Sequence, residues 1–371
     1  MVKELLQSYG YQKEDIDLII NIYPLNCYKE KDLIIKIESI YKLFLELGYT
    51  KEEIIKITKT VPNIFCYNIE SLKQKIKNIC SLGYKEEEII RMSKKFPHVY
   101  SYSIDNLKNK IKDIKTLGYT TQQIIIMTKK APSILGLNIN NMKKKLEDMV
   151  LIGYTKEETL KMTKSLPEIF CLSIEIINEK IENMTSLGYT KEEIIKMTIA
   201  LPSLYSYNTK SLNKKIEDIC SLGYTKEEVI NMSKKNSAIY SLSIENMKQK
   251  IEDICNLGYT KEEVINMTKK LPTLYGLNIN TIKEKINFYN SINLSNLIII
   301  KPQYLMQSVS LSYARYNYFK DNGIIIDMSN YNKLFKSQNS FKKQHKISNE
   351  ELVEKYNYDK YLEAKTNGRT I

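Results

Sequence analysis

The most constraining feature of this chain is a segment of 35 residues that repeats seven times without a gap, with copies beginning at Gly48, Gly83, Gly118, Gly153, Gly188, Gly223 and Gly258. A fixed period of this length is typical of stacked repeat proteins. Each unit of such a protein buries its apolar face against its neighbours. Positions in a copy are counted from its glycine, so Gly48 is position 1 and Leu82 is position 35.

Each copy predicts two helices joined by a short turn. In the first copy Thr50 is followed three residues later by Glu53, a capping box that satisfies free backbone N–H groups at a helix start. Apolar residues then recur at helical spacing as far as Val61. Pro62 ends the helix because proline disfavours the helical conformation in the residue before it. The apolar residues after it predict one turn of 3₁₀ helix.

The second helix of each copy begins after an asparagine or serine that can cap it, namely Asn68, Ser103, Asn138, Ser173, Asn208, Ser243 or Asn278. It ends at the glycine of the next copy, which supplies a left-handed C-terminal conformation. No segment shows the strict apolar–polar alternation of a strand. We therefore predict an all-α protein, an α-solenoid of about nine helix-turn-helix repeats of 35 residues.

The regular copies occupy only part of the chain. Residues 1–47 form a divergent first repeat, residues 48–292 the seven regular repeats, and residues 293–346 a degenerate last repeat with a cap. Residues 347–371 are polar and predict one exposed helix and a frayed tail. In the copy at Gly223, Asn236 and Ser237 replace the usual apolar residue and proline, which predicts a slightly longer first helix and a bend.

Charge and composition narrow the function classes. The net charge of +13 favours a polyanionic partner such as nucleic acid, although the abundance of lysine, isoleucine and asparagine is also what an AT-rich genome would encode. No apolar run approaches the length of a membrane span, and the N-terminus resembles neither a signal peptide nor a transit peptide. We therefore expect a cytoplasmic protein that does not enter a membrane.

The sequence contains no pattern typical of an enzyme. His98 and His345 are isolated, and no phosphate-binding, dinucleotide-binding or zinc-protease motif occurs. The six cysteines form no CxxC pair, so we expect no metal site and no cofactor, and we predict buried, apolar roles for the cysteines. The paired glutamates of each copy belong to capping turns.

A row of cations is the leading candidate site. Position 28 is lysine in every regular copy, whereas position 27 varies freely. One cation per repeat suits a surface that tracks phosphates. The alternative is structural, because position 28 borders the apolar stripe, where a lysine stem can lie over the core. The candidates are Lys75, Lys110, Lys145, Lys180, Lys215, Lys250 and Lys285, with Arg315 at the equivalent place in the degenerate repeat.

Two further sets of residues are weaker candidates. Lysines end the first helix of several copies (Lys94, Lys95, Lys129, Lys130, Lys234, Lys235, Lys269 and Lys270), where they also suit the helix dipole. The residue after the proline varies, and Asn63, His98, Ser133, Ser203 and Thr273 are candidates for reading bases or shape, with drift at an exposed turn as the alternative. A tyrosine follows every repeat glycine, and we predict that these tyrosines pack between helices rather than stack on bases.

The repeated pattern L-G-Y-T-x-E-E-I-x-x-M, then L-P, then a capped helix K-I-x-x-I-x-x-L-G resembles the mitochondrial transcription termination factor (mTERF) family over roughly residues 10–345. The resemblance implies a half-ring superhelix that binds double-stranded DNA or structured RNA along a basic face. It also implies a role in organellar transcription, its termination, or RNA maturation. Because family members act in organelles, an organellar location is the alternative to the cytoplasm.

The leading hypothesis is a non-enzymatic, monomeric protein that binds double-stranded DNA or RNA and acts in transcription or its termination, or in RNA maturation. A protein-interaction scaffold without a nucleic-acid role is the alternative, and a protein partner is open in either case. A secreted repeat effector acting on host cells is a third hypothesis.

Overall fold

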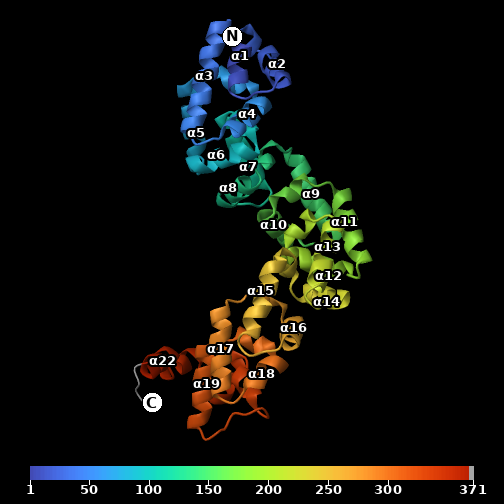
Figure 1. Cartoon of the computed structure of the whole chain (residues 1–371), viewed down its shortest axis with the longest axis vertical. Coiled ribbons are helices and arrows are strands. Elements are labelled where there is room, and N and C mark those ends of the chain that lie inside the picture. The colour runs from blue at the N-terminus through green and yellow to red at the C-terminus, as the bar shows by residue number, and fades with distance from the viewer. Residues whose placement is uncertain (367–371) are drawn as a thin grey trace. The chain divides into compact units, whose positions relative to one another are not determined.

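The computed structural model describes residues 1–366 and is all-helical (Figure 1), with 77% helix and no strand among these residues. Helical hairpins follow one another along the chain, which confirms the predicted all-α, mTERF-like solenoid. The chain divides into two compact units, Met1–Glu182 and from Asn183 onward, and the division falls inside helix α11. Each unit is described separately.

The first unit contains an N-terminal helix, the divergent repeat and the first regular copies, each copy as an α-helix, a 3₁₀ turn (η) and a second α-helix. Its elements are α1 (Val2–Ser8), α2 (Lys13–Asn21), η1 (Leu25–Cys27), α3 (Glu30–Glu46), α4 (Lys51–Thr60), η2 (Pro62–Cys66), α5 (Ile69–Cys80), α6 (Glu86–Lys95), η3 (Pro97–Tyr100), α7 (Ile104–Thr116), α8 (Thr121–Lys130), η4 (Pro132–Gly136), α9 (Ile139–Ile152), α10 (Lys156–Ser165), η5 (Pro167–Cys171) and the first part of α11 (Ile174–Ser186).

The second unit holds the remaining copies and the C-terminal cap. Its elements are α12 (Lys191–Ala200), η6 (Pro202–Ser206), α13 (Thr209–Cys220), α14 (Lys226–Lys235), η7 (Ser237–Ser241), α15 (Ile244–Cys255), α16 (Lys261–Lys270), η8 (Pro272–Gly276), α17 (Ile279–Ser291), α18 (Ser295–Ile300), η9 (Pro302–Met306), α19 (Val309–Asp321), η10 (Tyr331–Phe335), α20 (Gln338–His345), α21 (Asn349–Lys355) and α22 (Tyr358–Thr366).

The local signals in each copy act as the sequence predicts. The Thr50 hydroxyl accepts from the Glu53 backbone N–H, and the Glu53 carboxylate accepts from the Thr50 N–H. Pro62 then opens the 3₁₀ turn, and the Asn68 side chain caps α5 by accepting from the Ser71 N–H. Gly83 has φ of +105°, a backbone conformation that favours glycine, and a Cβ there would lie 2.7 Å from Ile125 Cδ1, so the Ile125 side chain would have to shift.

Neighbouring repeats are joined by buried hydroxyl pairs as well as by apolar packing. The tyrosine at position 2 reaches the serine or threonine at position 11 of the next copy, and the oxygens are 2.5 to 2.7 Å apart. The pairs are Tyr49–Ser93, Tyr84–Thr128 and Tyr119–Thr163 in the first unit, and Tyr189–Ser233 and Tyr224–Thr268 in the second. The tyrosines are buried, which confirms that they pack between helices.

Two threonines of α4 test what this pairing contributes. Thr58 is fully buried and its hydroxyl lies 2.7 Å from the Tyr11 hydroxyl, whereas the exposed Thr60 bonds only to the Lys56 carbonyl. We expect Thr58→Val to lower the free energy of unfolding by about 1–2 kcal/mol, because it leaves the Tyr11 hydroxyl buried with one partner fewer. Thr60→Val serves as the matched control and should change it by less than about 0.5 kcal/mol. Urea unfolding measures both, and equal losses would contradict the role given to the pair.

Three sequence predictions are wrong in detail. Helix α14 ends at Lys235, in register with the other copies, because Asn236 caps the next turn and the Ser237 hydroxyl donates to the Met197 carbonyl at 3.2 Å. No cysteine is buried: Cys27 and Cys171 are exposed and the other four are half-buried, because positions 19 and 33 lie at the margin of the apolar stripe. The segment predicted as an exposed tail contributes a fully buried Leu352 and a buried Tyr358, while residues 367–371 lie outside the described chain.

Candidate nucleic-acid interface

Four of the lysines at position 28 donate to the turn of the following repeat. The ammonium groups of Lys110, Lys215 and Lys250 each donate to the carbonyl of the residue that ends that turn, namely Leu137, Leu242 and Leu277. Lys285 donates in the same way to the Leu305 carbonyl in the degenerate repeat. The end of a 3₁₀ turn leaves carbonyls without helical partners, so a cation placed there satisfies them.

Burial of this row follows from that contact. Lys145 and Lys285 are 8% and 7% exposed, and Lys75, Lys110, Lys180, Lys215 and Lys250 are half-buried. Burial lowers the pKa of Lys110, Lys145, Lys180, Lys215 and Lys285. Lys75 donates to the Tyr67 hydroxyl at 2.9 Å and lies 4.9 Å from the centre of its ring. The structural alternative predicted a lysine stem over the core, whereas the observed contacts join the ammonium groups to carbonyls and to a hydroxyl. Phosphate contact by the half-buried members stays a prediction.

One member of the row is corrected. Arg315 is too deeply buried for its charged group to meet a phosphate in this conformation, whereas phosphate contact by Lys145 and Lys285 stays a prediction. Arg315 is 1% exposed, and burial lowers its pKa to about 10. Its guanidinium donates to three acceptors in the C-terminal cap and lies against the Phe341 ring.

The lysines that end the first helices also serve contacts between repeats. Four of the position-12 lysines pair with the capping glutamate of the preceding copy: Lys94 with Glu53 (2.8 Å), Lys129 with Glu88 (2.7 Å), Lys234 with Glu193 (3.0 Å) and Lys269 with Glu228 (2.8 Å). The hydrogen bond from the lysine is the largest cause of the lowered pKa of Glu88 and Glu228. At position 13, Lys95, Lys130, Lys235 and Lys270 donate to carbonyls at the end of the next first helix.

The variable residues after the proline do not converge on one site. Asn63 and His98 are exposed and line a cavity of about 340 Å³ in the first unit. Ser133 and Thr273 are half-buried beside sulfur atoms, at 3.7 Å from Cys171 Sγ and 3.8 Å from Met306 Sδ, and Ser203 is half-buried. Only Asn63 and His98 are therefore brought together, and base readout by this set stays a prediction.

A different set of lysines, missed by the sequence analysis, is exposed. Lys73 and Lys77 on α5, and Lys108 and Lys112 on α7, occupy positions 26 and 30 of consecutive copies. Two residues four apart share one face of a helix, and α5 packs against α7. Within the described residues these four ammonium groups make no ion pair and no hydrogen bond. We call them the basic face. The sequence pattern that could have indicated this face is the spacing of the four lysines, which places them on the side of the helix away from position 28.

A second group of cations lies in the C-terminal cap, where Lys342, Lys343 and Lys346 are exposed and Lys333 and Lys336 are half-buried. Lys333, Lys336, Lys342, Lys343 and Lys346 fall within a stretch that contains no acidic residue. Burial lowers the pKa of His345 in their midst, with the charges of Lys336, Arg315 and Lys333 as further causes. This C-terminal basic cluster therefore presents a positive potential.

Comparison with protein families shows to which family the chain is related. The mTERF family model matches residues 4–220 and 177–342, two overlapping segments that cover most of the chain. The chain belongs to the mTERF family. Among curated proteins, no relative matches it.

Membership places the chain among repeat proteins that generally bind nucleic acid and are not enzymes. In this mTERF protein the repeat-to-repeat contacts occupy most of the cations at positions 12, 13 and 28. The four lysines of the basic face are left to solvent. Among the described helices, none is both long and apolar enough to cross a membrane.

Proposed function

We propose that this mTERF protein binds a nucleic-acid duplex and that the basic face of α5 and α7 supplies phosphate contacts in its first unit. The observation that carries the proposal is the set of four exposed and unpaired ammonium groups on two adjacent helices. Neighbouring lysines on one helix are separated by about 5–6 Å at their Cβ atoms, and packed helix axes by about 8–10 Å. Duplex phosphates present charge at comparable intervals along each strand.

Phosphate contact needs cations that lose little by leaving their present environment. Among the described residues, the four lysines of the basic face have no protein partner to surrender, whereas Lys110 or Lys215 would have to give up a carbonyl. Each contact with duplex DNA releases a condensed counterion, so four contacts contribute about −3.6 to the slope of log K against log salt. The C-terminal basic cluster is expected to add to this slope.

Replacing Lys73, Lys77, Lys108 and Lys112 together by glutamine tests the proposal. We expect the slope of log K against log salt to become about 3.6 less negative, with at least a tenfold loss of affinity at about 50 mM salt. Fluorescence anisotropy with labelled duplex DNA and duplex RNA, at several salt concentrations, measures both quantities. The same titration reports which of the two polymers the protein prefers.

The matched control removes the same charge from first helices of the same unit, by replacing Lys51, Lys56, Lys156 and Lys161, which are all exposed, with glutamine. It should keep most of the affinity. If both variants lose affinity equally, binding follows net charge rather than this face. If the unaltered protein binds neither polymer at low salt, the proposal fails and the result favours the scaffold hypothesis.

Within this proposal, the protein acts in transcription or its termination, or in RNA maturation. The cytoplasmic location and the monomeric state remain predictions, which cell fractionation and analytical ultracentrifugation would check.

A further inference from the structure

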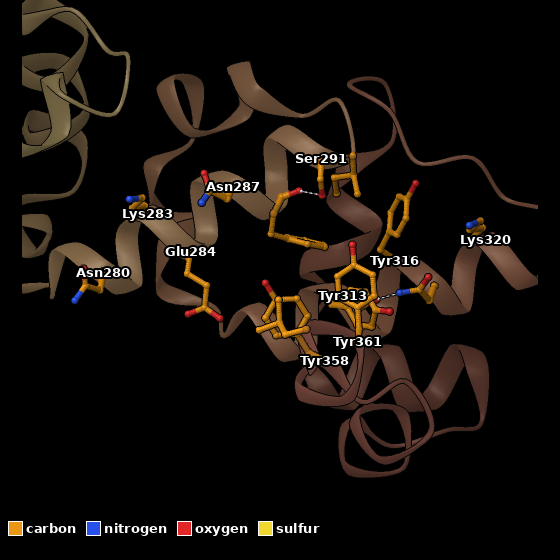
Figure 2. Close-up of a pocket in the computed structure, with 14 residues that line it drawn as sticks. Asn280, Lys283, Glu284, Asn287, Ser291, Tyr313, Tyr316, Lys320, Tyr358 and Tyr361 are labelled. Carbon is orange, nitrogen blue, oxygen red and sulfur yellow. Dashed lines mark hydrogen bonds between the residues drawn. The ribbon is translucent and has the colours of Figure 1, made fainter. Parts of the chain in front are cut away.

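The C-terminal cap, residues 331–366, folds back onto α19. Tyr358 and Tyr361 of α22 lie against Tyr313 of α19, with ring centroids 5.1 and 4.9 Å from it, beside a cavity of about 620 Å³ (Figure 2). Helix α21 also packs on α19. The end of α20 meets α19 further along that helix, and His345 lies at this contact.

The His345 ring is enclosed by aromatic rings of α19 and α20. Its centroid lies 5.4 Å from those of Tyr318 and Phe319, at interplanar angles of 75° and 85°, and 4.5 Å from that of Phe341. Its Nδ1 atom is 3.5 Å from the Tyr318 hydroxyl. Its Nε2 atom is buried and forms no hydrogen bond among the described residues. An unpaired acceptor nitrogen is costly to bury, and a charged N–H donor in the same place costs more.

The charges that act on this ring are positive. The Arg315 guanidinium of α19 lies 4.4 Å from the centre of the Phe341 ring, so it already occupies a face of that ring. Lys333 lies on η10, and Lys336 directly follows η10. Burial lowers the pKa of His345, and the charges of Lys336, Arg315 and Lys333 lower it further.

The carboxylates of the neighbouring elements do not offset these cations. They are Asp321 at the end of α19 and Glu350, Glu351 and Glu354 on α21. Asp321 accepts from the Tyr356 hydroxyl, Glu350 from the Gln338 side chain and Glu351 from the backbone N–H of its helix cap, while Glu354 is exposed. Within the described residues, no carboxylate pairs with His345. The remaining cations of these segments are Lys320, Lys342, Lys343, Lys346 and Lys355.

We propose that His345 is an acid-sensitive latch of the C-terminal cap, which holds α20 against α19 while its ring is neutral and releases the cap when the ring is protonated. An imidazolium would place a second cation near Arg315 and bury a charged N–H without an acceptor. Opening of the cap brings the ring into water, where the charged form is solvated. The proposal does not depend on nucleic-acid binding.

The direction of the pH dependence follows from the lowered pKa. Above about pH 6.5, the ordinary histidine value, the ring is neutral in both the closed and the open cap, so the stability of the closed cap is fully present. Below that pH the open cap takes up a proton before the closed cap does. The equilibrium constant for opening therefore rises by up to about tenfold per pH unit, and it levels off below the pKa of the closed cap.

Hydrogen exchange of the full-length protein at pH 7.5 and 5.5, corrected for the intrinsic pH dependence of exchange, measures this opening. We expect the opening of residues 331–355 to increase by about threefold or more at the lower pH, and that of α16 and α17 in the same unit to change by less than about twofold. The chain has one other histidine, the exposed His98. NMR of the two imidazole rings therefore follows His345 directly, and it should titrate below about pH 6.5.

His345→Phe, which keeps an aromatic ring without a titrating nitrogen, should remove the pH dependence of cap opening. His98→Phe is the matched control and should leave that dependence unchanged. Lys336→Gln removes one neighbouring cation and should reduce the dependence while the histidine stays in place. The proposal is overturned if the cap of the unaltered protein opens equally at both pH values, if the dependence persists in His345→Phe, or if His345 titrates at or above about pH 6.5.

Discussion

Above about pH 10 this protein is expected to unfold within about one pH unit. Ten tyrosines are each less than 7% exposed and have a pKa raised chiefly by burial: Tyr11, Tyr49, Tyr84, Tyr100, Tyr119, Tyr189, Tyr224, Tyr240, Tyr275 and Tyr289. Most are members of the hydroxyl pairs that join neighbouring repeats. Ionising any of them in place would put an anion into the core.

The sign of the pH dependence follows from the direction of these shifts. Below about pH 10 the tyrosines are neutral in both folded and unfolded chains, so the stability from keeping them neutral is fully present. As pH rises past 10, only the unfolded chain releases protons. Stability then falls by about 1.4 kcal/mol per pH unit for each tyrosine, or about 14 kcal/mol per unit for ten. Native domains are stable by only about 5–15 kcal/mol.

The buried lysines make the stability rise with pH, and their contribution is smaller than that of the tyrosines. Burial lowers the pKa of Lys110, Lys145, Lys180, Lys215 and Lys285, so stability rises with pH between their folded values and about 10.4, the ordinary lysine value. These five groups offset only part of the tyrosine contribution.

Circular dichroism at 222 nm and tyrosinate absorbance at 295 nm, recorded together against pH, measure the transition. We expect both signals to change in one steep step. Tyr224→Phe should make the step less steep, and Tyr23→Phe, at a tyrosine that is 75% exposed, should leave it unchanged. A gradual rise in absorbance centred near pH 10 with helicity intact would show that the tyrosines ionise in place.

Replacing Arg315 by methionine is expected to lower the free energy of unfolding of the C-terminal region by about 3–5 kcal/mol. One Nη atom donates to the carbonyls of Leu334 (2.8 Å) and Lys336 (2.7 Å), and the other to Asn349 Oδ1 (2.8 Å). One side chain on α19 thus holds η10 and the start of α21. Methionine keeps the apolar stem but leaves these acceptors without that donor.

Hydrogen exchange locates the effect and urea unfolding measures its size. Amides of residues 331–355 should lose protection in Arg315→Met, while those of the regular repeats of the same unit keep theirs. The free energy of unfolding of Arg315→Lys should lie between those of the unaltered protein and Arg315→Met, because one ammonium group cannot reach all three acceptors. Lys320→Met, at an exposed cation on the same helix, is the control. A loss of less than about 1 kcal/mol in Arg315→Met would contradict the role given to this side chain.

Arg315 also shows where the sequence analysis reached its limit. It occupies the place of the position-28 lysines in the degenerate repeat. Its assignment to phosphate contact was wrong, because the acceptors that enclose it come from segments about 20 to 34 residues further along the chain. Nothing in the local pattern indicates that those segments fold back onto α19.

The period, the limits of the helices and the packing of the tyrosines could all be inferred from the chain, because caps, prolines, glycines and apolar spacing act over a few residues. The candidate interface could not be inferred from the chain in this way. Positions 26 and 28 lie about 80° to either side of the apolar stripe on a helix that turns about 100° per residue. A lysine has the same local surroundings at both. The turn of the following repeat covers the side that holds position 28, where Lys110, Lys215 and Lys250 donate to its carbonyls. Only this contact between stacked copies distinguishes these lysines from those of the basic face, which make no such contact among the described residues.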